Sequence, residues 1–188
     1  MQAEWFATPG PQNTQATIEV VKARLKEGDI TRVAIATTSG ATAVAFAEAL
    51  AESGVALVCV THHVGFTGGD ASQLEPEHRD ALRRLGAEIV TATHALSGVG
   101  RSISKTLGGV SGPEVVAHTL RLLGQGMKVC VEIAVMAADA GRIPTDQDVI
   151  CVGGTGRGAD TAVVLRPAHM NAFFDLKIRE TLCRPIGA

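Results

Sequence analysis

Hydroxyl side chains and a glycine gather at the end of one apolar segment of this chain. The apolar residues 33–36 (V-A-I-A) are followed directly by T-T-S-G-A-T at residues 37–42. An apolar run of this kind favours a buried strand, and the Ala-rich residues 41–53 favour a helix. The unpaired N–H groups and dipole of a helix start attract an anion. We therefore predict phosphate binding by Thr37, Thr38, Ser39, Gly40 and Thr42. The alternative is an ordinary turn in which Thr38 or Ser39 caps the helix.

A second cluster of glycines lies near the end of the chain. Residues 153–160 (G-G-T-G-R-G-A-D) separate two apolar runs, at residues 148–152 and 161–166, that have the pattern of strands. Glycine-rich turns expose backbone N–H groups to an anion, and an arginine adds a planar donor fork. We predict phosphate contacts from Gly154, Thr155, Gly156 and Arg157. Because the two strands are so close in sequence, we expect them to be antiparallel.

Two further segments are candidates for the same site. Residues 94–109 are long and rich in Gly and Ser, which suits a functional loop or a short helix that lines a site. From this segment we predict binding contacts by Ser97 and Arg101. His62 and His63 follow an apolar run, and one of them is placed to reach a ligand; we include His63 in the predicted site. Adjacent residues of an extended chain point to opposite faces, so we expect no metal site there.

Catalysis is less clearly indicated than binding. The chain has no G-x-x-x-x-G-K-[ST] and no G-x-S-x-G, and its G-x-G-x-G at residues 154–158 leads to a strand rather than a helix. Glu132 and Asp139 lie seven residues apart on a predicted helix at residues 127–140, and so on one face of it. They form either a carboxylate pair that reaches a ligand or metal, or a helix cap plus one separately hydrogen-bonded acid. A small enzyme is therefore the alternative function. Its base is His62 or His63, its electrophile Arg101 or Arg157, and its acid Glu132 or Asp139.

Composition and pattern indicate one α/β domain over residues 1–188. The chain is 46% hydrophobic and 19% charged, and its net charge of -2 argues against nucleic-acid or membrane-surface binding. Apolar runs that follow helices predict a parallel sheet buried on both faces, mixed at the glycine hairpin. Residues 178–183 are expected to form an edge strand. The first helix carries Lys22, Arg24 and Lys26 on its predicted solvent face.

The cysteines and the N-terminus favour a cytoplasmic protein. Four cysteines lie far apart without a C-x-x-C pair, so we expect structural thiols, with Cys183 the most accessible. Neither a targeting segment nor an apolar run long enough to span a bilayer is present in the sequence. Apolar helices such as residues 115–123 have a face to bury against a second copy, which leaves a homo-oligomer open.

The two glycine-bearing loops resemble a known family. Residues 35–43 (I-A-T-T-S-G-A-T-A) resemble the phosphate-binding loop in the C-terminal, effector-binding domain of pyruvate kinase, and residues 152–162 resemble its late hairpin loop. Nearly the entire chain resembles the stand-alone pyruvate kinase alpha/beta domain proteins of archaea and bacteria. Runs that carry this likeness are residues 63–66, 96–98, 101–104, 107–111, 128–133, 136–139, 157–164 and 166–171.

This resemblance implies a fold and a class of ligand. The fold is a three-layer α/β/α sandwich around a mixed, mostly parallel sheet. The ligand is a sugar phosphate or flavin mononucleotide (FMN). Pyruvate kinase activity is not implied, since the barrel domain that carries the catalytic groups has no counterpart here. Residues 97–111 and 168–175 are extra relative to pyruvate kinase. We therefore expect a binding or regulatory protein for a phosphorylated small molecule.

Overall fold

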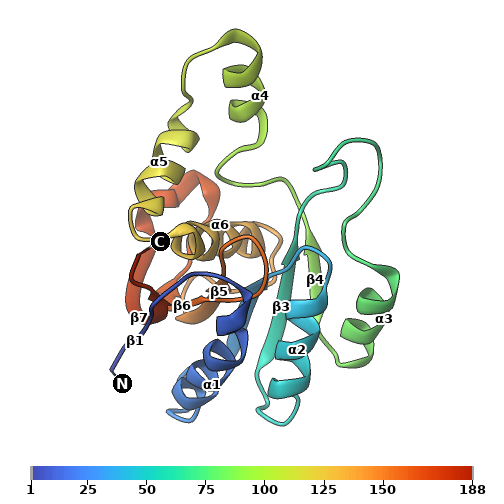
Figure 1. Ribbon diagram of the computed structural model, residues 1–188, viewed down its shortest axis with the longest axis vertical. Helices are drawn as coiled ribbons and strands as arrows, with labels where there is room; N and C mark the ends of the chain where they lie inside the picture. Colours follow the sequence, from blue (N-terminus) through green and yellow to red (C-terminus); the bar gives the residue numbers. More distant parts are fainter. Residues whose placement is uncertain (1, 188) are drawn as a thin grey trace.

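A seven-stranded sheet forms the centre of the computed structural model, which describes residues 2–187 (Figure 1). The strand order is β1-β7-β6-β5-β2-β3-β4. All neighbouring strands are parallel except β6, which runs antiparallel to both β5 and β7. The strands are β1 (Glu4–Phe6), β2 (Arg32–Ala36), β3 (Ala56–Thr61), β4 (Glu88–Thr91), β5 (Val149–Gly153), β6 (Thr161–Arg166) and β7 (Lys177–Pro185). The prediction of an α/β fold with a mixed, mostly parallel sheet is confirmed.

Helices cover both faces of this sheet. They are α1 (Thr14–Leu25), α2 (Ala41–Leu50), α3 (Pro76–Arg84), α4 (Gly98–Leu107), α5 (Gly112–Arg121) and α6 (Gln125–Asp139), with short 3-10 helices η1 (Pro11–Asn13) and η2 (Met170–Asp175). The buried residues of α1, α2 and α3 share one apolar core, and those of α6 belong to a second core across the sheet. The result is an α/β sandwich from which α4 and α5 extend at one end (Figure 1).

The central strands are apolar on both sides because both sides are covered. In β2, Val33 and Ile35 pack into the core with α1 and α2, whereas Ala34 between them packs against α6. Successive side chains of a strand point to opposite faces, so a strand between two helical layers needs a continuous apolar run. The runs in β2 and β3 thus follow from burial on both faces.

Helix α6 confirms the prediction of a buried helix for residues 127–140. Its first half alternates like a strand, yet nearly every residue from Gly126 to Ala138 is buried. A helix surrounded by the sheet and α5 is apolar on most sides, and this obscures its period. Gly141 follows the helix with a φ of 69°, a left-handed conformation that suits glycine. None of the helices formed by residues 2–187 has the length and hydrophobicity that crossing a membrane requires.

Two predictions about the end of the chain fail at Cys183. β7 is not the outermost strand, because β1 pairs with its end, with Glu4 opposite Cys183 and Phe6 opposite Pro185, while β1 does not reach residues 178–182. The prediction could not include this pairing, which joins the two ends of the chain. For the same reason Cys183 is fully buried rather than accessible, and burial raises the pKa of its thiol to about 12. Among the described residues all four cysteines are free and buried.

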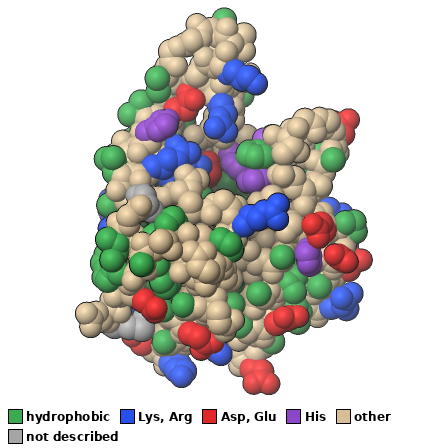
Figure 2. Space-filling model, in the orientation of Figure 1, with side chains coloured by type: hydrophobic (Ala, Val, Ile, Leu, Met, Phe, Trp, Pro, Cys, Tyr) green, Lys and Arg blue, Asp and Glu red, His purple; other side chains and the backbone are tan. Residues whose placement is uncertain are grey.

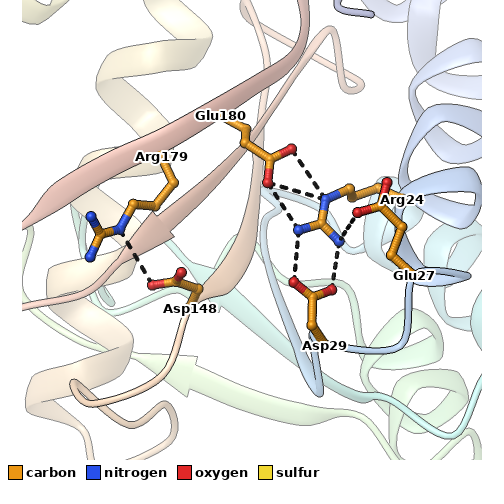
Figure 3. Close-up of polar contacts among 6 residues, drawn as sticks. All are labelled: Arg24, Glu27, Asp29, Asp148, Arg179 and Glu180. Atoms are coloured by element: carbon orange, nitrogen blue, oxygen red, sulfur yellow. Dashed lines mark hydrogen bonds and ion pairs between the residues drawn. The ribbon is translucent and has the colours of Figure 1, made fainter. Parts of the chain in front are cut away.

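The prediction that Arg24 lies on the solvent face of α1 is also wrong. It is 3% exposed, and its guanidinium lies among three carboxylates (Figure 3). Asp29 accepts two hydrogen bonds at 2.6 and 3.0 Å, Glu180 of β7 accepts from Nη2 at 2.9 Å, and Glu27 lies 3.1 Å away. β7 passes beside α1 and supplies Glu180, so a distant strand buries the arginine. The hydrogen bonds from Arg24 lower the pKa of Asp29.

Replacement of Arg24 is expected to destabilise the fold. Arg24→Met keeps most of the buried stem but removes the charge-assisted hydrogen bonds, and it leaves the three carboxylates close together. We expect a loss of about 1.5–3 kcal/mol in the free energy of unfolding at pH 7, measured by urea titration. The carboxylates are about half exposed, which keeps the loss below that of a fully buried pair.

The effect of Arg24 should also depend on pH. The pKa of Asp29 is lower in the folded state, so its contribution is present above about pH 4 and is lost as pH falls through that lower pKa. The stabilities of wild type and Arg24→Met should therefore converge in acid. Lys26→Met on the exposed end of the same helix is the control and should change stability by less than about 0.5 kcal/mol. Equal effects of the two substitutions would contradict the structure.

Candidate functional site

A cavity of about 550 Å³ opens at the carboxyl ends of β2, β3 and β5. Its walls come from the loop and first turn after β2, the loop after β3, one side of α6 and the glycine turn after β5. Figure 2 shows histidine side chains beside a hollow on this face, with lysine and arginine side chains nearby. In open α/β sheets ligands bind at this edge, because the loops after parallel strands converge there.

The first predicted phosphate loop lies in the cavity wall. Thr37, Thr38, Ser39 and Thr42 line the cavity, and Gly40 connects them at the N-cap position of α2. Gly40 has a φ of 107°, and a Cβ there would lie 2.4 Å from the Cβ of His78, so only glycine fits. The Thr37 hydroxyl accepts a hydrogen bond from the Gly40 N–H at 3.2 Å, which holds the turn closed.

The start of α2 has backbone N–H groups without a partner in the described part of the structure. The N-cap residue is Gly40, which has no side chain, and the Ser39 hydroxyl only approaches the Ala41 N–H at 3.5 Å. Within residues 2–187, the N–H groups of Thr42 and Ala43 have no hydrogen-bond acceptor. These donors point along the helix axis toward the cavity, where the hydroxyls of Thr38 and Thr42 lie.

The second predicted loop lines the same cavity, next to the first, because it follows the neighbouring strand β5. Gly154, Gly156 and Arg157 line it, and Arg157 is exposed to solvent. A Cβ at Gly154 would lie 2.5 Å from the carbonyl oxygen of Gly158, so the turn folds back on itself too tightly for a side chain. Thr155 is not part of the wall. Its hydroxyl is buried and has no partner among the described residues.

Asp160 holds this glycine turn in place. The carboxylate is fully buried and accepts from the Gly10 N–H at 3.0 Å, the Thr155 N–H at 3.1 Å and the Thr161 hydroxyl at 2.8 Å. The glycine turn is thereby attached to the segment before α1. The sequence alone does not predict this role. A single acid that ends a glycine-rich turn before a strand is the signal that could have indicated one.

Three predicted residues lie away from the two loops. Ser97 and Arg101 do not line the cavity, because residues 98–107 form α4, which extends from the body of the protein (Figure 1). Arg101 borders a separate depression with Phe66 and Lys105. His63 also lies outside the cavity wall, and its Nδ1 donates to the carbonyl of Val64 at 2.7 Å.

His62 and His94 take the place of His63 in the wall. His62 Nδ1 lies 2.6 Å from Gln73 Oε1, so this nitrogen carries the proton. Burial lowers the pKa of His62, partly offset by that hydrogen bond. His94 was not predicted to be functional, because its partners lie on α6, far along the sequence.

Glu132 is the buried acid of the site. Its Oε1 accepts from the Leu96 N–H at 3.0 Å, and its Oε2 contacts Lys128 Nζ and lies 3.6 Å from His94 Nδ1. Burial tends to raise the pKa of Glu132, but the neighbouring His94 ring and the charge of Lys128 lower it to about 2. Glu132 is therefore ionised at neutral pH. Lys128, itself buried, has a pKa lowered chiefly by burial.

Glu132 and Asp139 do not form the carboxylate pair that their spacing allowed. Asp139, at the end of α6, accepts from the Met170 N–H at 3.2 Å and lies 3.0 Å from His169 Nδ1. It takes no part in the cavity wall. The alternative of a helix cap plus one hydrogen-bonded acid is met only in part, because Glu132 and Asp139 have separate hydrogen-bond partners and neither caps α6.

Potential metal ligands gather elsewhere. Over residues 2–187, the one close group of three such side chains is Glu75, Glu77 and His78 at the exposed start of α3. This group does not line the cavity. No model of a known protein family matches the chain. The chemistry of the site is therefore argued from the geometry of its own residues.

The buried ion pair generates a stability prediction. Glu132→Leu leaves the Lys128 ammonium buried without a counter-charge, and we expect a loss of about 3–5 kcal/mol in urea unfolding at pH 7. The double variant Lys128→Met/Glu132→Leu should recover most of that loss, because apolar groups replace both charges. Glu48→Leu on the exposed side of α2 is the matched control. A double variant no more stable than the single one would refute a buried pair.

Proposed function

We propose that this protein binds a phosphorylated small molecule, a sugar phosphate or FMN, in a binding or regulatory role and without pyruvate kinase activity. One observation carries the proposal: two elements suited to anion binding, from distant parts of the sequence, line a single cavity. These elements are the start of α2 with its free N–H groups and the glycine turn with Arg157, and residues of both line the cavity.

The energetics of these groups suit a phosphate ester. Three or four charge-assisted hydrogen bonds at roughly 1.5–3 kcal/mol each are enough for about micromolar affinity. The cavity volume of about 550 Å³ falls within the range of roughly 300–1,000 Å³ typical of small-molecule sites. Val60, Val129, Ile133 and Met136 supply an apolar wall for the body of the ligand.

The resemblance in sequence supports the same proposal. The two loops of the cavity are those that resemble the activator-binding loops of the pyruvate kinase C-terminal domain. We infer a pyruvate kinase alpha/beta domain-like sandwich whose ligand phosphate lies between residues 37–42 and 153–158. The four free, buried thiols suit a reducing compartment, and we propose a cytoplasmic location.

Self-association is a further part of the proposal. Val115 is 54% exposed and Leu122 is 80% exposed, on and just after α5. An apolar helix face of this kind suits burial against a second copy of the chain. Net charge and composition give no basis for a nucleic-acid partner.

Arg157→Ala tests the phosphate site. Loss of one charge-assisted donor should weaken binding of FMN or ribose 5-phosphate about 10-fold or more, measured by calorimetry or by thermal shift across a panel of phosphorylated metabolites. Arg157 is exposed, so the melting temperature of the free protein should not change. Mass spectrometry and visible absorbance of the purified protein would reveal a ligand that co-purifies.

Arg84→Ala is the matched control, since Arg84 is exposed on the last turn of α3 and does not line the cavity. It should leave binding unchanged. If no phosphorylated compound raises the melting temperature of the wild type, or if Arg157→Ala and Arg84→Ala bind alike, the proposed function is wrong.

A further inference from the structure

Two histidines share one wall of the cavity with an aromatic cover. The ring centroids of His62 and His94 lie 5.2 Å apart. Phe66, from the loop after β3, stacks on His62 at 3.9 Å and on His94 at 5.2 Å, each with an interplanar angle of 22°. Phe66 thereby shields both imidazoles from water. Imidazole is the side chain best suited to proton transfer near neutral pH.

His94 presents a nitrogen that the protein leaves unused. Its Nδ1 faces Glu132, whereas its Nε2 is buried and has no hydrogen-bond partner in the described part of the chain. Buried polar atoms are nearly always paired, so an unpaired nitrogen in a cavity wall indicates a group that a ligand supplies. The 3.6 Å separation from Glu132 is long for a hydrogen bond, but such contacts commonly tighten when a ligand binds.

His62 is arranged differently. Its Nδ1–H donates to Gln73, so Nε2 carries a lone pair. Burial favours the neutral ring, as the lowered pKa of His62 indicates. The two rings therefore have different surroundings: His62 is neutral, whereas His94 faces the carboxylate of Glu132. When the environments of two titratable groups differ in this way, one acts as base and the other as acid.

The charged side chains near His62 and His94 belong to helices α4, α5 and α6. Glu132 and Lys128 of α6 lie behind His94, and Glu132 can balance a positive charge on that ring. Arg101 of α4 and Arg121 of α5 act on Lys128 at longer range. The ring of His63 lies 5.5 Å from that of His94, edge on.

The proposed phosphate loop lies next to these rings. The Thr37 N–H donates to the carbonyl of Val60 at 3.0 Å, which joins the end of β2 to the end of β3 just before His62. A ligand with its phosphate at α2 therefore extends toward the histidines past apolar side chains. Phosphate at one end fixes the position of the atoms at the other.

We propose that His62 and His94 act as general base and general acid on a phosphorylated α-hydroxy carbonyl compound, and interconvert aldose and ketose phosphates. This inference rests on the proposed function, because the phosphate loops hold the substrate. Glu132 is a positioning residue that orients His94 and balances its charge.

The step balances without an external reagent. His62 Nε2 takes the proton from the carbon next to the carbonyl, and the C–H electron pair forms a carbon–carbon double bond. The carbonyl π pair takes a proton from His94 Nε2–H, which gives a neutral enediol. The ligand's other hydroxyl then loses its proton to His94, and His62 returns a proton to the former carbonyl carbon. Both histidines recover their original states, and the reaction is redox-neutral.

Proton exchange in D₂O tests this inference directly. Wild-type protein is incubated with dihydroxyacetone phosphate, glyceraldehyde 3-phosphate, ribose 5-phosphate or fructose 6-phosphate, and proton NMR follows the C–H next to the carbonyl. We expect deuterium to replace that proton in at least one compound, with formation of its aldose or ketose isomer. The dephosphorylated sugars should exchange only at the uncatalysed rate.

Asparagine variants identify the groups responsible. His62→Asn and His94→Asn retain a polar group toward Gln73 and Glu132 but remove Nε2. Each should lower the exchange rate about 100-fold or more. Calorimetry should show that both variants still bind the phosphorylated probe, which separates loss of chemistry from loss of folding. His118→Asn, at an exposed position on α5, should exchange at the wild-type rate.

The outcomes separate this inference from the proposed function. If the wild type binds these phosphates but exchanges none of their protons, the acid–base pair is refuted and the phosphate site stands. If His62→Asn and His94→Asn exchange as fast as the wild type, the assignment of the two histidines is refuted. If no phosphorylated compound binds, both the proposed function and this inference are wrong.

Discussion

The parallel pairing of β2 with β5 is the constraint on which the site depends. Val33 lies opposite Ile150 and Ile35 opposite Val152, so the two strands end at the same edge of the sheet. Each strand is followed immediately by a glycine-bearing loop, and the pairing brings these loops from distant parts of the sequence to one cavity. A different strand order would separate the two loops.

Much of the fold was predictable because its signals are local. Apolar runs, glycine stops and helix periods identify the central strands and helices, including α6 with its mixed pattern. The errors arose where a distant partner decides the outcome. Arg24 looks like a solvent-facing residue until β7 brings Glu180 beside it, and β7 looks like an edge strand until β1 pairs with its end. Neither partner is visible in the local sequence.

The same distinction applies to the site. The loops at residues 37–42 and 153–158 carry their signals within a few residues, and the structure places both at the cavity. His94 and Glu132 are isolated in sequence, and only the packing of α6 against the sheet joins them. For Arg101 the local signal misleads. The Gly- and Ser-rich composition of residues 94–109 suits a binding loop, but Arg101 lies on α4 and borders a separate depression.

The pairing of the first strand with the last has a consequence for synthesis. β1 is made well before its hydrogen-bonding partner β7, because most of the described residues lie between the two strands. The Gly10 N–H likewise has its hydrogen-bond acceptor, Asp160, far along the sequence. As the chain is made, β2, β3 and β4 can pair with one another first, β5 and β6 can add to β2, and β1 finds its place only once β7 is present. Until then β1 is an unpaired strand edge, and its pairing requires the closure of a long loop.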